Sequence, residues 1–422
     1  MNLPVPQIDD DQRQAPGGLV ALATYVRAHG YEAEICDLAG TPAEQLTPEH
    51  LPEAEVYGLS LYTATCYLAY GFAACLRQAR PEAFLVAGGP HASAVPEEVL
   101  AHGFDAVVCG EGEEALVAIL DHLARGERAA VPDLIRARPI EDLDALPFPD
   151  YSGLCDMRRY SRRIAGLPVM ALDSSRGCAN RCRFCNSRVM ERGCWRPRSP
   201  ESVLQEVRQH HEAGWRAFRF NDDSFLADRL RASEICRLLR PLDLKFRIFC
   251  RAEDLAAPGL CDALAEAGCV HVGVGIESLD PSMLARMAKA QRVSVIQEGL
   301  ARARAAGLLT RGFFIVGFPG ETDETVARTL DALPHLALDE ATCYPCLPYP
   351  GTDLAVRPSS YGITWIDPDY SKYIQAGHER STGYLLATRS FGPEQVRCWR
   401  DQFLQAFDRL GIAWSDQLGI VT

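Results

Sequence analysis

The sequence alternates short apolar runs with longer amphipathic stretches, and this rhythm limits the folds open to the chain. In the second half, helical patterns separate the apolar runs, which cover residues 169–172, 217–221, 246–250, 271–276, 312–317 and 341–347. Parallel strands need crossover connections of this length, usually helical ones. Six strands spaced about 25–45 residues apart predict an open, partial (β/α)6 barrel rather than the closed eightfold form.

The first part of the chain has the same rhythm and predicts a separate α/β domain. Apolar runs cover residues 34–38, 56–61, 84–87 and 106–109, and a helical pattern that begins near residue 19 closes at His29–Gly30. We therefore predict a doubly wound, Rossmann-like parallel sheet. Such a sheet normally begins with a strand, but Pro4 and Pro6 exclude a central strand at the start. Either the true start lies upstream or this sheet lacks its first strand.

The predicted domain boundaries follow from these patterns. Residues 1–125 form the first α/β domain, 126–168 a linker, 169–355 the partial barrel and 356–422 a mostly helical C-terminal region. The segment LPFPD at 146–150 predicts a rigid, extended crossing within the linker, since each proline restricts its own backbone and that of the residue before it.

Composition narrows the partners of this chain of 422 residues. The formal net charge of -13 argues against a nucleic-acid partner, because phosphate binding needs a basic surface. No apolar run approaches the roughly 20 residues that span a bilayer, and the first residues do not resemble an export signal. We predict a cytoplasmic protein, in which 16 cysteines stay reduced or bind metal.

Three cysteines, Cys178, Cys182 and Cys185, form a C-x-x-x-C-x-x-C pattern without a fourth cysteine nearby. A disulfide framework is disfavoured in a long chain without an export signal. Zinc would need a second C-x-x-C or a histidine pair. A cubane iron–sulfur cluster has four irons, so three thiolates leave one iron open to another ligand. An open coordination position is typical of a catalytic metal site.

Polar or glycine-rich segments follow the other predicted strands of the barrel. In parallel βα folds, functional groups gather at these C-terminal strand ends. The segments are NDDSF at 221–225, FCRAE at 249–253, GIES at 275–278, GFPGE at 317–321 and LPYPG at 347–351.

Together, the cysteine loop and these segments resemble the radical S-adenosylmethionine (SAM) superfamily. The resemblance covers residues 15–355 and is to the branch with an N-terminal cobalamin-binding-like domain, of the class B methylase type. In the first domain it is carried by SLYT at 60–63, AGGPHAS at 87–93 and CGEGE at 109–113, and in the linker by LPFPD.

The resemblance implies that Cys178, Cys182 and Cys185 ligate a 4Fe–4S cluster, whose open iron receives the amino and carboxylate groups of SAM. Other residues would contact SAM: Phe184 the adenine, Asp222 or Asp223 the amino group, Arg251 the carboxylate, Glu277 and Ser278 the ribose or substrate, and Phe314 through Gly317 the adenine by backbone groups. Asp222 is also a candidate helix cap.

The resemblance leaves cobalamin open, because the string D-x-H-x-x-G that supplies a cobalt-ligating histidine is absent from the chain. Glycine turns at strand ends suit a nucleotide tail. The candidate cobalamin residues are Tyr62, Thr63, Gly88, Gly89, His91, Gly110 and Gly112, with an ordinary surface histidine as the alternative for His91.

The predicted activity is reductive cleavage of SAM to a 5′-deoxyadenosyl radical that abstracts a substrate hydrogen, with electrons from a flavodoxin or ferredoxin. We expect cobalamin-dependent C-methylation of a small natural-product precursor, as in antibiotic biosynthesis. The alternative is cobalamin-independent dehydration, deoxygenation, epimerisation or rearrangement of an aminosugar or nucleoside. Cys250 and Cys346, near strand ends, are candidate hydrogen donors for epimerisation or else core residues. RNA methylthiolation is disfavoured because the tail has no basic run.

Overall fold

The computed structural model describes residues 1–8, 10, 14–154, 157–191, 193–374, 383–414 and 420–421, and the chain forms two compact units. Unit 1 comprises Met1–Tyr160, Asn186–Arg192 and Pro368–Ile374. Unit 2 comprises Ser161–Cys185, Gly193–Asp367 and Gln375–Thr422. Each unit draws on segments that are distant in sequence.

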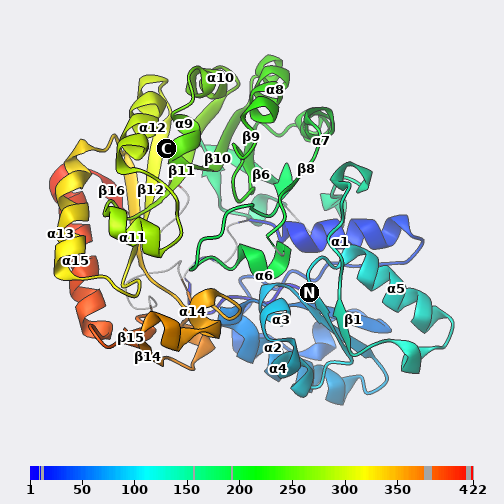
Figure 1. Cartoon of the computed structure of the whole chain (residues 1–422). Coiled ribbons are helices and arrows are strands. Elements are labelled where there is room, and N and C mark those ends of the chain that lie inside the picture. Colours follow the sequence, from blue (N-terminus) through cyan, green and yellow to red (C-terminus); the bar gives the residue numbers. More distant parts are fainter. Residues whose placement is uncertain are drawn as a thin grey trace. The chain divides into compact units, whose positions relative to one another are not determined.

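Unit 1 is built on a parallel sheet, which confirms the predicted Rossmann-like α/β class (Figure 1). Among the described residues its four strands are adjacent in chain order: β1 (Val56–Ser60), β2 (Phe84–Gly88), β3 (Ala106–Cys109) and β4 (Leu134–Arg136). The helices are α1 (Gly17–Ala28), α2 (Cys66–Ala79), α3 (Pro90–Ala94), α4 (Pro96–Ala101), α5 (Glu113–Ala124) and α6 (Ser187–Glu191). The last strand lies inside the stretch predicted as a linker.

The first residues take the position of the strand that the sequence did not reveal. Asn2 forms a parallel bridge with Asp37, and the Ser60 amide donates a 3.2 Å hydrogen bond to the Met1 carbonyl. The Met1 nitrogen donates to the Gly58 carbonyl at 2.6 Å. Residues 1–2 therefore pair with β1 on one side and with residues 36–38 on the other. The predicted strand at 34–38 is reduced to this single bridge, because Pro4 ends the pairing after two residues.

Unit 2 is built on a curved sheet, which confirms the predicted partial barrel. Its six main strands are parallel: β6 (Leu167–Leu172), β9 (Ala217–Phe220), β10 (Lys245–Arg251), β11 (Cys269–Glu277), β12 (Leu309–Val316) and β13 (Glu340–Pro345). On one side of these strands, β5 (Arg163–Ile164) pairs with β6 and β17 (Ile420–Val421) pairs with β5, and on the other side β16 (Ala413–Trp414) pairs with β13. Two short pairs lie apart: β7 (Ser175–Arg176) with β8 (Arg196–Pro197), and β14 (Ile363–Ile366) with β15 (Leu386–Thr388).

Helices cover the outer face of this sheet (Figure 1). The described helices of unit 2 are α7 (Pro200–Glu212), α8 (Arg229–Leu239), α9 (Ala252–Leu255), α10 (Leu260–Glu266), α11 (Pro281–Arg286), α12 (Val293–Ala305), α13 (Asp323–Ala332), α14 (Asp353–Val356) and α15 (Pro393–Leu410). Part of the region after residue 356 lies outside the described residues. Within the rest, α15 packs Phe403 and Phe407 against Phe314 of β12.

The two faces of the sheet carry different side chains. Residues such as Phe246, Ile248 and Phe314 point to the helices and are fully buried. Because side chains alternate along a strand, Phe249 and Phe313 point to the inner face, where they are only half-buried. The inner face of the sheet is therefore the accessible one, as a partial barrel requires for a site in its interior.

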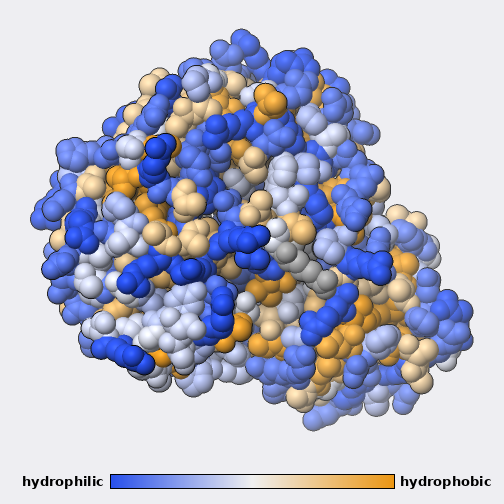
Figure 2. All heavy atoms as spheres, in the orientation of Figure 1, coloured by the Kyte–Doolittle hydropathy of each residue, from blue (hydrophilic) through white to orange (hydrophobic). Residues whose placement is uncertain are grey.

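The face in Figure 2 is mostly hydrophilic, and hydrophobic residues appear among the others in small groups. Within the described part of the chain, no helix is long and apolar enough to cross a membrane.

Two helical glycines provide a matched test of the packing. An added Cβ at Gly299 of α12 would lie 2.2 Å from the Ala252 carbonyl oxygen, whereas one at Gly71 of α2 would meet no atom within 4 Å. We expect Gly299→Ala to destabilise the protein by about 1–3 kcal/mol through overpacking. Gly71→Ala should instead stabilise it by about 0.5–1 kcal/mol. Urea unfolding measures both, and shifts of the same sign would contradict the packing described.

Candidate functional site

The three predicted cluster cysteines lie on one loop of unit 2 that begins after β7. Cys178, Cys182 and Cys185 form no disulfide and are partly exposed. The Cys185 amide donates to the Cys182 carbonyl at 3.3 Å, and the Asn180 side-chain amide donates to the Cys178 sulfur at 3.4 Å. No described group of three His, Cys, Asp or Glu side chains converges on a single ion. Three cysteines on one short loop fit a cluster, in which each thiolate binds a different iron.

Arg183 ties the middle of the loop to the body of unit 2. Its amide donates to the Met287 carbonyl at 3.0 Å, and its guanidinium donates to the Arg286 carbonyl at 3.1 Å. The same guanidinium lies 5.8 Å from the ring centroid of Tyr361. These contacts hold the loop at the C-terminal end of α11.

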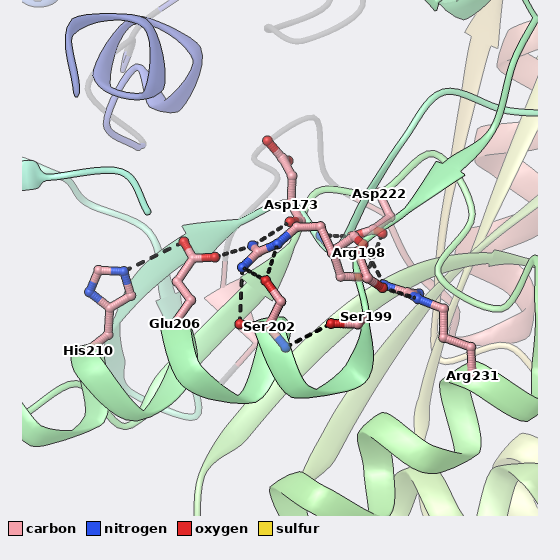
Figure 3. A network of polar contacts seen from close by, with 9 residues as sticks. Asp173, Arg198, Ser199, Ser202, Glu206, His210, Asp222 and Arg231 are labelled. Atoms are coloured by element: carbon pink, nitrogen blue, oxygen red, sulfur yellow. Dashed lines mark hydrogen bonds and ion pairs between the residues drawn. The ribbon is translucent and has the colours of Figure 1, made fainter. Parts of the chain in front are cut away.

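A buried carboxylate, Asp222, holds the segment that leads into the loop (Figure 3). Asp222 follows β9 and is 2% exposed. It accepts hydrogen bonds from the Ser174 amide at 3.1 Å, the Ser174 hydroxyl at 2.7 Å and the Ser175 hydroxyl at 2.5 Å. The carboxylate predicted to contact SAM or cap a helix instead joins the ends of β6 and β9. The cap of α8 is Asp228.

Two arginines complete this support (Figure 3). Arg198 forms an ion pair with buried Glu206 of α7, and its amide donates to the Ser174 carbonyl at 3.0 Å. Arg231 of α8 donates to the Arg198 carbonyl at 2.7 Å and also to the Ser174 carbonyl. Ser174 is thus held by Asp222, Arg198 and Arg231, so the loop starts from a rigid point. Such support keeps functional groups in position without contacting the reactants.

Charged side chains surround Cys182 at the inner face. The Arg251 guanidinium lies 4.0 Å from the Cys182 sulfur, donates to Glu253 at 2.5 Å and also donates to the Lys289 carbonyl. The Lys289 ammonium donates to Glu277 at 2.8 Å. Burial raises the pKa of the Cys182 thiol, while Lys289 and Arg251 oppose that rise. The positive charges favour thiolate, the form that ligates iron.

Glu277 lies in a strained position at the end of β11. Its φ is +67°, which is unusual for a residue other than glycine, and the pairing with β12 shifts register between Gly275 and Glu277. An added Cβ at Gly275 would lie 2.7 Å from both the Glu277 carboxylate and the Lys289 ammonium. Gly275 therefore leaves room for the Glu277–Lys289 pair, and the strain coincides with the predicted SAM site.

The remaining predicted SAM residues have different surroundings. Phe184 is half-buried and Asp223 is exposed, so both remain candidates. The Ser278 hydroxyl is 3.1 Å from the Thr329 hydroxyl and accepts from the Asp280 amide at 3.1 Å, so it holds a turn against α13. Phe314 belongs to the outer core, and strands on both sides already pair with its backbone. The Gly317 amide donates to Glu321 at 2.5 Å.

The two cysteines considered as hydrogen donors are both buried. Cys250 alternates with Phe249 and Arg251 along β10 and therefore points to the helices, beside Cys261 of α10. Its thiol therefore lies on the face opposite the cluster loop, which favours the core role considered for Cys250 over hydrogen donation. Cys346 is 3% exposed, and burial and the Glu321 carboxylate raise its pKa.

In unit 1, the predicted cobalamin residues lie at the C-terminal ends of β1 and β2. Gly89 has a φ of +93°, and an added Cβ would lie 3.0 Å from the Leu61 carbonyl oxygen. The Tyr62 side chain is 51% exposed, whereas Thr63 is buried. Gly88 ends β2 and precedes this turn, so backbone is presented at the strand ends, as nucleotide binding requires.

His91 is fully buried, which excludes the surface position considered from the sequence. Its Nε2 lies 3.1 Å from the Tyr70 hydroxyl and its Nδ1 3.3 Å from the Thr63 hydroxyl. Burial lowers the pKa of His91, although Glu98 opposes this, so the ring is neutral at neutral pH. The Tyr370 ring packs against it with centroids 5.1 Å apart. Both nitrogens have partners within unit 1.

The turn after β3 also contains glycines that present backbone at the end of a strand. Gly110 has a φ of +94°, and its amide donates to the Ser93 hydroxyl at 2.9 Å. An added Cβ at Gly112 would lie 3.4 Å from Leu22. These glycines join β3 closely to α5, and the close packing suits a fold that brings backbone to a bound nucleotide.

Comparison with known proteins identifies both units. Residues 172–333 match the model of the radical SAM superfamily, and residues 12–120 match that of the B12-binding domain. Over 362 residues the chain is 32% identical to uncharacterized methyltransferase PH0819 of Pyrococcus horikoshii, covering 80% of this chain and 77% of that protein. The chain belongs to the radical SAM superfamily, in the branch that carries a B12-binding domain, and is an enzyme. The predicted cofactor set of a 4Fe–4S cluster, SAM and cobalamin is confirmed at the level of the family.

Two solved structures have the same fold. TsrM of Kitasatospora setae, solved with cobalamin and a 4Fe–4S cluster, superposes with a TM-score of 0.72 at 19% identity, covering 96% of this chain and 89% of that one. OxsB, solved with aqua-cobalamin, superposes with a TM-score of 0.72 at 17% identity, covering 94% of this chain and 64% of that one. At these sequence identities, the structural similarity establishes the fold of the chain.

Sequence reasoning missed several inner-face residues. Lys289 lies in the helix connection 287–292, where no strand-end rule points to it. Asp173 directly follows β6 and is exposed. Arg247 lies in the middle of β10, where an arginine in the sequence suggests an exposed side chain. For the two strand residues, the available signal was the alternation that places Asp173 and Arg247 on the inner face.

The cluster assignment is tested by single Cys→Ala substitutions at 178, 182 and 185. After anaerobic reconstitution with iron and sulfide, we expect each variant to lose most of its bound iron and visible absorption, because a three-ligand site has no spare thiolate. Cys194→Ala is the control, since this exposed cysteine is outside the triad. Full iron binding by any of the three variants would exclude that cysteine as a ligand.

The buried Lys289–Glu277 pair is tested by stability. Both side chains are less than 10% exposed, so Lys289→Met leaves an unpaired buried carboxylate and should cost about 3–5 kcal/mol. The double variant Lys289→Met/Glu277→Leu should recover part of that loss in urea unfolding, since it removes both charges. A double variant that is less stable than the single would show that the two side chains act independently.

Proposed function

We propose that this protein is a cobalamin-dependent radical SAM enzyme that methylates a carbon of a small molecule. The observation that carries the proposal is the presence, in one chain, of the three-cysteine loop with its charged surroundings and of the B12-binding fold. The relative PH0819 is named a methyltransferase, which supports this direction. The substrate would be a natural-product precursor, and a flavodoxin or ferredoxin would supply electrons.

The side chains of unit 2 fit the binding of cluster and SAM. When bound, these cofactors supply one-electron cleavage of SAM, and cobalamin supplies the methyl group. Cys178, Cys182 and Cys185 would hold the cluster. Arg251, 4.0 Å from Cys182, would pair with the carboxylate of SAM, and exposed Asp223 would accept from its amino group. Asp222 has a different role, because its oxygens bind Ser174 and Ser175.

In unit 1, the turns at Gly89 and Gly110 would admit the cobalamin tail to the strand ends. His91 would support the strand ends of unit 1 rather than ligate cobalt, because Tyr70 and Thr63 already contact its two nitrogens. The missing D-x-H-x-x-G string is consistent with this.

The proposal predicts the products of SAM. Anaerobically reconstituted enzyme, given SAM, a one-electron reductant and candidate substrates, should release both S-adenosylhomocysteine and 5′-deoxyadenosine. The first reports methyl transfer through cobalamin and the second hydrogen abstraction. Enzyme reconstituted without cobalamin is the control and should form no S-adenosylhomocysteine. Deoxyadenosine alone, with cobalamin bound, would favour the rearrangement and dehydration alternatives.

A further inference from the structure

The inner face of unit 2 carries several side chains that are accessible to solvent. Asp173 at the end of β6 is exposed, and Asn221, Phe249 and Phe313 are half-buried although they belong to the central strands. The outer-face residues between them on the same strands are fully buried. This difference between faces shows that the accessible surface lies inside the curved sheet.

Two aromatic rings lie on this accessible inner face. The centroids of Phe249 and Phe313 are 6.0 Å apart, and an added Cβ at Gly273, on the strand between them, would lie 2.7 Å from Phe249 and 3.0 Å from Phe313. Gly273 therefore allows both rings to lie over β11. The rings offer an apolar contact surface to a bound molecule.

Arginines lie one layer deeper. Arg247 is paired in register with Arg219 of β9 and His271 of β11. The guanidinium carbons of Arg247 and Arg219 lie 5.0 and 5.2 Å from the Phe249 ring centroid. Arg219 is half-buried and Arg247 is 2% exposed, so Arg247 forms the floor.

The floor has unused hydrogen-bonding groups. Within the described residues, Nε and Nη2 of Arg247 have no hydrogen-bond partner, nor do Nδ1 of His271 and the hydroxyl of Thr342. All three residues are more than nine-tenths buried. A buried charged donor without a partner is strongly unfavourable, so an acceptor is expected at this place.

The carboxylate of Glu340 does not supply the missing acceptor for Arg247. Glu340 attracts Arg247 only from a distance, because its Oε2 lies 3.2 Å from Arg311 and 3.4 Å from His271. Burial and the charges of Arg162 and Arg311 lower the pKa of Arg247 to about 9, so it remains a cation at neutral pH. The missing partner is therefore an anion.

We propose that Arg247 binds a carboxylate or phosphate group of the substrate, whose apolar part packs against Phe249 and Phe313. The inference rests on the proposed function, since it concerns the substrate of the same site. Arg247 and Arg251 are separated by four residues along β10, or about 13 Å at about 3.3 Å per residue. The substrate is thus an elongated anion that spans from the floor to the level of Cys182, with its acidic group remote from the reacting carbon.

The test uses benzoate and phenyl phosphate, which share an aromatic body and differ in the anion. Each is titrated into the reconstituted holoenzyme at low ionic strength by calorimetry, for the wild type, Arg247→Met and Arg247→Lys. We expect at least one probe to bind the wild type, at least tenfold weaker binding to Arg247→Met, and partial recovery in Arg247→Lys. Because Arg247→Met removes an unpaired buried charge while keeping an apolar side chain, it should remain folded.

Arg237→Met is the matched control, since Arg237 lies on the outer helix α8 with a side chain 67% exposed. It should bind both probes as the wild type does. The stronger probe identifies whether the group is a carboxylate or a phosphate. Equal binding by wild type and Arg247→Met, or no binding of either probe to the wild type, would overturn the proposal.

A second readout separates this subsite from the proposed function. Arg247→Met should still bind SAM and cleave it to deoxyadenosine without substrate, because the residue is remote from the cysteine loop. Probe binding that depends on Arg247 in an enzyme that never forms S-adenosylhomocysteine would retain the subsite and reject methylation. Methylation of an uncharged substrate, unaffected by Arg247→Met, would instead retain methylation and reject the subsite.

Discussion

The carboxylate of Asp222 is the contact on which the rest of the cysteine site depends. It joins the ends of β6 and β9 by accepting three hydrogen bonds from Ser174 and Ser175. The cysteine loop begins shortly after this point, and Arg198 and Arg231 both donate to the Ser174 carbonyl. A loop with three partly exposed thiols needs such an anchor, because a cluster requires its ligands at fixed separations.

Charge is distributed in layers along the inner face of unit 2. Near Cys182, the cations Arg251 and Lys289 are matched by Glu253 and Glu277 within short hydrogen bonds. Deeper, the carboxylate of Glu340 is shared, and Arg247 keeps unused donors. The upper layer suits the two charged groups of an amino acid such as the methionine part of SAM. The lower layer suits a single anion, and half-buried aromatic rings separate the two.

Much of this could be predicted, and the failures have physical causes. The six main strands of the barrel and three of unit 1 were found because apolar runs between helical patterns are a strong local signal. The strand formed by residues 1–2 was missed, since two residues carry no periodicity. The role of Cys250 was left open between hydrogen donor and core residue, because proximity to a strand end does not say which face a side chain takes. The SAM contacts of Asp223, Phe184 and Arg251, like the cytoplasmic location, remain predictions.

The sequence by itself determined the class of chemistry, because the spacing of Cys178, Cys182 and Cys185 is local and needs no knowledge of the fold. It also determined the α/β architecture through the order of its apolar runs. Only the tertiary structure decided which charged residues meet. The contacts of Asp222 with Ser174 and of Lys289 with Glu277 join segments that are distant in sequence. The fold also decided that Arg247 is buried with nitrogen atoms that lack a hydrogen-bond partner among the described residues. Such pairings depend on strand register and burial, which no single segment encodes.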